Sequence, residues 1–183
     1  LKREFKTAIG RKVFDGAGLD PDVEVSAPTY TSAIIELVGS GLVFDYASKY
    51  CGERNAPASL KEFRLSDEEY QKFTSWVREQ KFTYSSELDL KAEELIASAK
   101  KEKYFDELQS SLKDLKNRIE QNKNSAWVRG KPELSKILEE EIAFHYRMLQ
   151  GQIEVSLSRD LEIQEARKVL SDPIAYKKFL SPN

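Results

Sequence analysis

Residues 85–122 have the sequence SSELDLKAEELIASAKKEKYFDELQSSLKDLKNRIEQN, and this stretch decides the fold class. Apolar residues recur in it mostly at steps of four and three: Leu88, Ala92, Leu95, Ala99, Phe105, Leu108, Leu112, Leu115 and Ile119. Mostly charged and polar side chains fill the other faces, which is typical of a helix that packs along a narrow seam. The stretch predicts one long helix, on the order of 50 Å if unbroken, with Glu102 as the expected place for a break.

A second long helix is expected to return beside the first. Residues 134–149 carry apolar side chains at helical spacing, and residues 129–132 read Arg-Gly-Lys-Pro before them. Such a sequence suits a turn between helices, with Pro132 at the first helical position, where its missing N–H costs nothing. The two segments together predict a long antiparallel helical hairpin.

Shorter helices are expected before the hairpin. Residues 31–47 have helical apolar spacing that is interrupted by Gly-Ser-Gly at residues 39–41, which predicts one interrupted helix or two short ones. Ser66 and Glu69 have the spacing of a capping box, in which the serine oxygen accepts a backbone N–H and the glutamate reaches back to the cap. A helix should therefore begin after Ser66.

The N-terminal residues have a different character. Residues 2–7 and 11–14 predict strands around a turn at Gly10, residues 20–22 read Asp-Pro-Asp and predict a second turn, and residues 23–25 alternate like a short final strand. A hairpin with one further strand is not stable alone, because its apolar face needs a sheet or a helix to cover it. This segment is therefore expected to be the margin of another domain.

These patterns give a fold class and a domain organisation. The chain is predicted to be mainly α, with a small N-terminal β-hairpin and strand remnant over residues 1–26. A connecting helix or pair of helices should occupy residues 27–52, and a C-terminal helical domain residues 53–183. The Asn-Ala-Pro-Ala-Ser sequence at residues 55–59 is the expected boundary, and residues 161–170 predict a last amphipathic helix.

Composition excludes several classes of protein. Lysine and arginine total 29 and aspartate and glutamate 31, for a net charge of −2, whereas a nucleic-acid-binding protein shows a basic surplus. No apolar run approaches the roughly 18 residues of a membrane span. Cys51 is the single cysteine, so no internal disulfide can form. Because the sequence starts at Leu1 rather than a methionine, we expect it to be part of a longer protein.

Short catalytic patterns are present but carry little weight. Ser-x-x-Lys, which places a serine near a lysine base, occurs at Ser98–Lys101 and at Ser110–Lys113. That is about what chance predicts for a chain of this composition. A lysine on a solvated helix face keeps a pKa of about 10 and is a poor base at neutral pH.

The remaining candidates also favour structural roles. His145 is the only histidine and lies on an apolar helix face, so a packed, hydrogen-bonded side chain is expected rather than a metal ligand. Cys51 has no cysteine or histidine neighbour and is expected to be buried filler. The Gly16-x-Gly18 pair has Pro21 where a dinucleotide fingerprint needs its third glycine. We therefore predict no catalytic, cofactor-binding or metal-binding residue in this chain.

Residues 5–23 resemble the end of the peptidase domain in the carboxy-terminal processing (tail-specific) serine peptidase family. In that family a strand leads into Thr-x-x-Gly-Arg, and another strand and a glycine-rich loop lead into Gly-Ile/Leu-x-Pro-Asp-Ile/Val. The matching positions here are Gly10, Arg11, Gly18, Leu19, Pro21, Asp22 and Val23, while Ala8 replaces a proline that is frequent in the family. The resemblance makes Gly10, Arg11, Gly18, Pro21 and Asp22 a structural motif.

The resemblance also implies a function. Family members use a serine nucleophile and a lysine base, both located before the Gly-Arg hairpin, and they cleave proteins near unstructured C-terminal tails. The chain is then the non-catalytic C-terminal region of such a peptidase, in the periplasm or cell envelope of a bacterium. Its expected partners are the upstream protease domain, protein substrates and a second copy of itself. The alternative is a stand-alone helical interaction module unrelated to proteolysis.

Overall fold

The structure is a computed structural model that describes residues 3–15, 21–123 and 126–181. It divides into two compact units. The helical body spans Thr29–Ser156, and the terminal unit combines Leu1–Pro28 with Leu157–Asn183. The prediction of a mainly helical chain with an N-terminal β-hairpin is confirmed.

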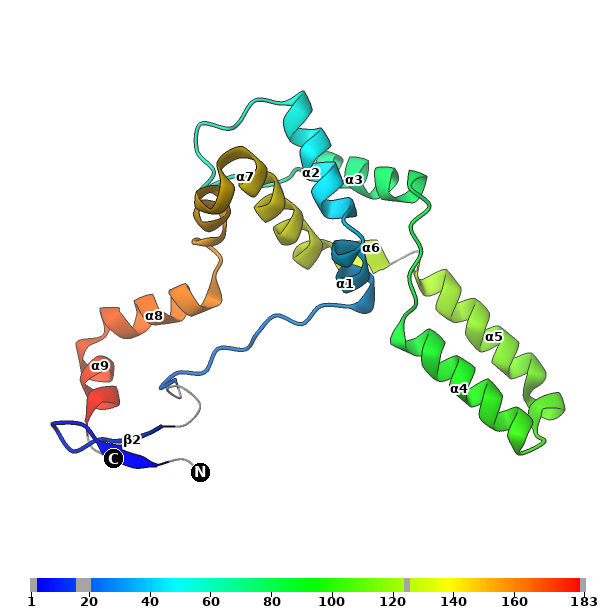
Figure 1. Cartoon of the computed structure of the whole chain (residues 1–183), viewed down its shortest axis with the longest axis horizontal. Helices are drawn as coiled ribbons and strands as arrows, with labels where there is room; N and C mark the ends of the chain where they lie inside the picture. The colour runs from blue at the N-terminus through cyan, green and yellow to red at the C-terminus, as the bar shows by residue number, and fades with distance from the viewer. Residues whose placement is uncertain (1–2, 16–20, 124–125, 182–183) are drawn as a thin grey trace. The chain divides into compact units, whose positions relative to one another are not determined.

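The helical body contains the helices labelled α1 to α7 in Figure 1. Their bounds are Ser32–Gly39 (α1), Leu42–Glu53 (α2), Asp67–Glu79 (α3), Glu87–Lys101 (α4), Phe105–Lys123 (α5), Ala126–Arg129 (α6) and Lys131–Ser156 (α7). The interruption expected at residues 39–41 separates α1 from α2, and Gly41 there has a φ of 82°, which a side chain would disfavour.

The core of the helical body lies where α1, α2, α3 and α7 meet. α2 packs most extensively against α7. Fully buried side chains fill this core: Leu37, Phe73, Leu134, Leu138 and Ile142. The Tyr46 ring lies 5.0 Å from the Phe73 ring, and the buried Tyr70 hydroxyl donates to the Trp127 carbonyl at 2.7 Å. The apolar face predicted for residues 134–149 is thus buried at Leu134, Leu138 and Ile142, whereas Met148 and Leu149 at its end are exposed.

The start of α3 confirms the predicted cap only in part. Ser66 is the N-cap residue, and its Oγ accepts the Glu69 backbone N–H at 3.2 Å. The capping box also predicts that the Glu69 carboxylate accepts the Ser66 backbone N–H, and this bond is not present. Both carboxylate oxygens instead accept from Nη2 of Arg54, at 3.1 and 3.0 Å, a pairing in which donor and acceptor both carry a charge. A complete capping box occurs at the start of α4, between Ser86 and Asp89.

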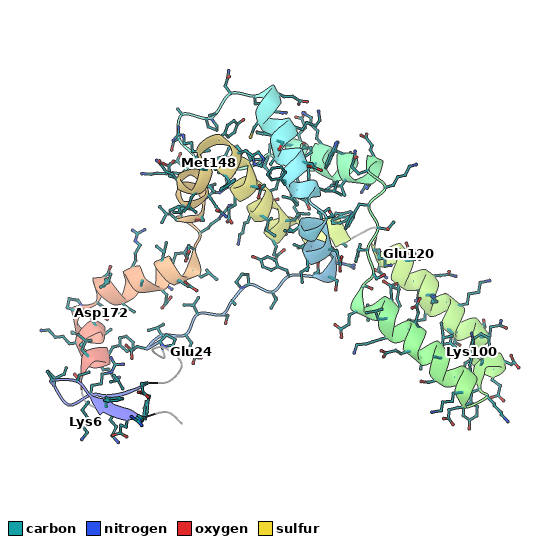
Figure 2. All side chains as sticks on the ribbon, viewed as in Figure 1. Lys6, Glu24, Lys100, Glu120, Met148 and Asp172 are labelled. Atoms are coloured by element: carbon teal, nitrogen blue, oxygen red, sulfur yellow. The ribbon has the colours of Figure 1, made fainter. Side chains whose placement is uncertain are left out.

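An antiparallel helical hairpin is present, but its partners differ from those predicted. The long helix breaks after Lys101, so α4 and α5 fold against each other (Figure 1) and α7 joins the core instead. The break is a Schellman motif: Lys103 has a φ of 63°, its N–H donates to the Lys100 carbonyl, and the Tyr104 N–H donates to the Ala99 carbonyl. Figure 2 shows Lys100 and Glu120 at opposite ends of this hairpin.

The helix α7 is bent, and the bend explains a glycine. Arg147 and Met148, the latter labelled in Figure 2, have non-helical backbone angles. The residues that follow turn back, so that a Cβ added to Gly151 would lie 2.1 Å from the Ala143 carbonyl oxygen. The apolar spacing of residues 134–149 does not predict this bend. The position requires glycine because the two backbone segments touch there.

The terminal unit contains β1 (Glu4–Lys6), β2 (Lys12–Phe14), α8 (Leu161–Ser171) and α9 (Pro173–Leu180). The two strands pair antiparallel, with Phe5 opposite Val13. Residues 23–25, predicted as a short final strand, form no strand within this chain, because no backbone hydrogen bond joins that segment to another described residue. Asp172 caps α9 by accepting the Ile174 and Ala175 N–H groups.

Candidate functional site

The peptidase-like motif builds the β-hairpin and its turn. Gly10 has a φ of 85°, which favours glycine, and its N–H donates to the Thr7 carbonyl at 2.9 Å. The Arg11 backbone N–H donates to Thr7 Oγ1 at 3.1 Å. The Arg11 guanidinium forms an ion pair with the Asp22 carboxylate. This pair joins the two halves of the motif, a contact that sequence reasoning missed although both residues were in the motif.

The other motif residues contribute differently. Pro21 lines a groove of about 600 Å³ together with Val23, Val25 and residues of α8. Two carboxylates, Glu162 and Glu165, also line it, and its other walls are mostly apolar. Gly18 lies outside the described residues.

The hairpin exposes apolar side chains on a very small sheet. Phe5 and Val13 form a cross-strand pair on one face, whereas Phe14 lies opposite Glu4 on the other. Phe5 is 51% exposed, and Ile9 in the turn is 59% exposed. A two-stranded sheet is marginally stable alone, so such side chains are typical of a sheet margin that another element covers. We take residues 3–15 with 21–25 as the candidate docking site.

The Ser-x-x-Lys pairs lie on the outside of the α4–α5 hairpin. Ser98, Lys101, Ser110 and Lys113 are all exposed. Lysines in such positions keep full hydration, which gives no reason for an activated base. No catalytic role follows for either serine.

A serine, a histidine and a glutamate meet between α2 and α7. Ser48 Oγ lies 2.8 Å from His145 Nε2, and His145 Nδ1 lies 2.8 Å from the Glu141 carbonyl oxygen and 3.4 Å from its carboxylate. These are the groups of an acyl-transfer triad. However, Ser48 lies within α2, where backbone N–H groups are occupied by helix hydrogen bonds and cannot form an oxyanion hole. We interpret the contact as a clamp between the two helices, and the prediction of a packed, hydrogen-bonded His145 is confirmed.

Cys51 is half-buried rather than buried as predicted. Its Sγ lies 3.6 Å from the Ile142 carbonyl. Burial raises the pKa of the Cys51 thiol, and a hydrogen bond with Tyr146 offsets this only in part. A thiol with a raised pKa is a weak nucleophile at neutral pH.

An ion pair joins α4 to α5 at the open end of their hairpin. The Lys123 ammonium lies 2.8 Å from the Asp89 carboxylate, which also accepts from the Ser86 hydroxyl and backbone N–H. Burial alone would raise the pKa of Asp89, but the hydrogen bonds from Lys123 and Ser86 outweigh it and lower that pKa. Within the described ranges, no cluster of three or more metal-ligating side chains occurs, and none of the helices there is long and apolar enough to cross a membrane.

The comparison with known proteins identifies the helical part of the chain. No curated protein and no solved structure matches it significantly. A protein family described as "Probable PDZ-protease, C-terminal helical domain" matches residues 33–170, which is more than half of the chain. The prediction of a C-terminal region of a processing peptidase is consistent with this match. The chain therefore belongs to the family of C-terminal helical domains of probable PDZ-proteases.

Proposed function

We propose that this chain is the non-catalytic C-terminal region of a carboxy-terminal processing serine endopeptidase, and that it supports the protease core. The observation that carries the proposal is the β-hairpin of residues 3–15. It carries the peptidase-like motif, and it precedes the range that the helical-domain family matches.

The contacts of the hairpin suit a docking role. The apolar pair Phe5 and Val13 needs a cover that two short strands cannot supply. Residues 23–25 belong to no helix or strand, and their backbone groups have no partner among the residues that the structure describes, so they suit addition to a sheet. The Arg11–Asp22 ion pair holds this segment beside the hairpin. Together they would complete a sheet of the upstream protease domain.

The same proposal includes two further roles for the helical body and a location. These are self-association of the peptidase and presentation of unstructured protein tails to its active site. The parent protein would use a serine and lysine upstream of the hairpin, in the periplasm or cell envelope. The stand-alone alternative has less support, because the family match is to a domain of a protease.

Digestion of an unfolded protein tests the proposal. The substrate is incubated with this chain and, in parallel, with a longer polypeptide that extends upstream through the protease domain. We expect only the longer polypeptide to cleave. Cleavage by the chain itself would contradict the proposal, and Ser48, Ser98 and Ser110 would then be the serines to replace first.

A further inference from the structure

The α4–α5 hairpin uses only part of its apolar surface to hold itself together. Its buried seam consists of Ala92, Ala99, Leu112 and Ile119. A second set, here called the leucine face, stays 40–62% exposed and consists of Leu88, Leu95, Leu108 and Leu115. In each helix these leucines are one heptad apart, which is the spacing of helix-to-helix contacts in coiled coils.

Helix geometry places the four leucines on one side of the hairpin. At about 100° per residue, Leu88 and Leu95 lie roughly 40–60° to one rotational side of buried Ala92. Leu108 and Leu115 lie at similar angles on the same rotational side of buried Leu112. Because the helices run antiparallel, equal rotational offsets bring both pairs to the same face.

The opposite face of the hairpin is polar. It carries the ion pairs between Asp89 and Lys123, at 2.8 Å, and between Glu93 and Lys116, at 3.7 Å. These side chains lie on the other rotational side of the buried seam. The hairpin is therefore two-faced, with ion pairs on one face and leucines on the other.

The ion pairs also fix the levels of the leucines. Since residue 89 lies beside residue 123 and residue 93 beside residue 116, Leu95 lies near the level of Leu115. Leu88 lies towards the open end, and Leu108 lies near the turn. The face therefore has a middle layer of two leucines and one leucine in each end layer. A copy turned end over end would bring Leu88 level with the partner's Leu108 and stack the two middle layers.

The borders of the leucine face suit a copy of itself. An ion pair between Lys91 and Glu87, at 3.2 Å, flanks it on α4, and one between Arg118 and Asp114, at 2.8 Å, flanks it on α5. Each border thus carries both signs of charge, and the whole chain has a net charge of only −2. Such borders do not select an acidic or a basic partner, and they do not repel a second copy.

We propose that the leucine face binds the same face of a second copy of this chain, so that two α4–α5 hairpins form an antiparallel four-helix bundle. This interface is a specific form of the self-association included in the proposed function, and it rests on the proposed function only for that role. A face about 20 Å wide and about 22 Å long, from helix diameter and rise, buries about 900 Å² over both copies. That is slightly below the roughly 1,000 Å² of specific interfaces and in the range of transient ones, so a weak, reversible dimer is expected.

Analytical ultracentrifugation over a concentration series tests the interface with matched variants. The double variant Leu95→Lys with Leu115→Lys places charges in the middle layer, and Leu90→Lys is the control, because Leu90 is also exposed on α4 but lies outside the leucine face. Circular dichroism checks that each variant is folded. The wild-type chain should dimerise, the double variant should dimerise at least tenfold more weakly, and Leu90→Lys should match the wild type.

A second measurement tests the two-fold geometry. In a Cys51→Ala background, Leu95→Cys should form an intermolecular disulfide on mild oxidation with copper phenanthroline, whereas Leu90→Cys should not. A wild-type chain that stays monomeric at the highest concentration, or a Leu90→Lys variant that weakens the dimer as much as the double variant, would overturn the proposal. A monomer whose leucine face binds reduced, carboxymethylated protein would overturn it too and indicate substrate presentation. None of these readouts depends on cleavage, so the interface can fail while the protease assignment stands.

Discussion

At Gly151 in α7, an added Cβ would lie 2.1 Å from the Ala143 carbonyl oxygen, which is backbone and cannot move aside. Gly151→Ala should therefore destabilise the chain by about 2 kcal/mol, although alanine favours a helix over glycine by about 1 kcal/mol. Gly52→Ala in α2 is the control, because nothing lies within 4 Å of a Cβ there. Urea unfolding should show Gly52→Ala neutral or stabilising; equal effects of the two variants would disprove the close approach at the bend.

The buried Tyr70 hydroxyl donates a hydrogen bond to the Trp127 carbonyl, and its pKa is raised. Burial, assisted by Glu133, raises the pKa of Tyr70 to about 12 from an ordinary 10.0. Because the unfolded state releases this proton first, the stability from Tyr70 is complete below pH 10.0 and is lost as pH rises through about 12. Tyr70→Phe should cost about 1 kcal/mol at neutral pH, since the Trp127 carbonyl loses its donor.

The difference between Tyr70→Phe and the wild type should narrow above the ordinary tyrosine pKa. Chemical unfolding across a pH series measures it, with Tyr104→Phe as the control because Tyr104 is exposed. A difference that stayed constant to the highest pH would show that Tyr70 ionises as it does in the unfolded chain.

Local sequence patterns predicted the residues that cap helices or form turns, because these roles depend on the nearby backbone alone. Ser66 caps α3 as expected, and Gly10 and Gly41 occupy turns with positive φ. Contacts between residues far apart in the sequence could not be predicted. Ser48 and His145, for example, lie 2.8 Å apart, but their positions in the sequence give no sign that they meet. The Arg11–Asp22 pair had a signal, namely opposite charges within one motif, but that signal does not specify a distance.

Among the elements, the turn between α4 and α5 offers a direct test. Lys103 has a φ of 63°, a left-handed conformation that costs a side-chain residue about 1 kcal/mol. Lys103→Gly should remove this strain and stabilise the hairpin by up to about 1 kcal/mol. Lys100→Gly, inside α4, should instead destabilise it by about 1 kcal/mol. Thermal unfolding compares the two; a loss of stability in Lys103→Gly would argue against the Schellman turn.

The same turn explains why the sequence predicts where the helices lie better than which helices pack against each other. The apolar spacing of residues 88–119 continues across the break, so it describes one long helix as well as two packed ones. No glycine or proline marks the turn, because Lys103 takes the position where helices usually end with glycine. The spacing does not specify which helix lies against which: Ala92 and Ala99 are buried within the α4–α5 hairpin, whereas Leu134 and Leu138 of α7 are buried in the core.

At the scale of the whole chain, the peptidase-like motif and the family match cover different parts of the sequence. The motif that suggests a peptidase lies in residues 5–23, whereas the family match covers residues 33–170. The two do not overlap and agree on a protease. The division of the chain at residues 26 and 52 stays a prediction about the longer protein. The motif residues Gly10, Arg11, Pro21 and Asp22 would then mark the junction between catalytic and helical parts.

Amide hydrogen exchange of β1 and β2 tests that junction most directly. Exchange is followed by mass spectrometry in this chain and in the longer polypeptide that includes the upstream protease domain. We expect fast exchange in the chain alone, because two short strands are marginally stable, and exchange slower by at least about a hundredfold in the longer polypeptide. Equal exchange in the two would contradict the claim that this hairpin completes a protease-domain sheet.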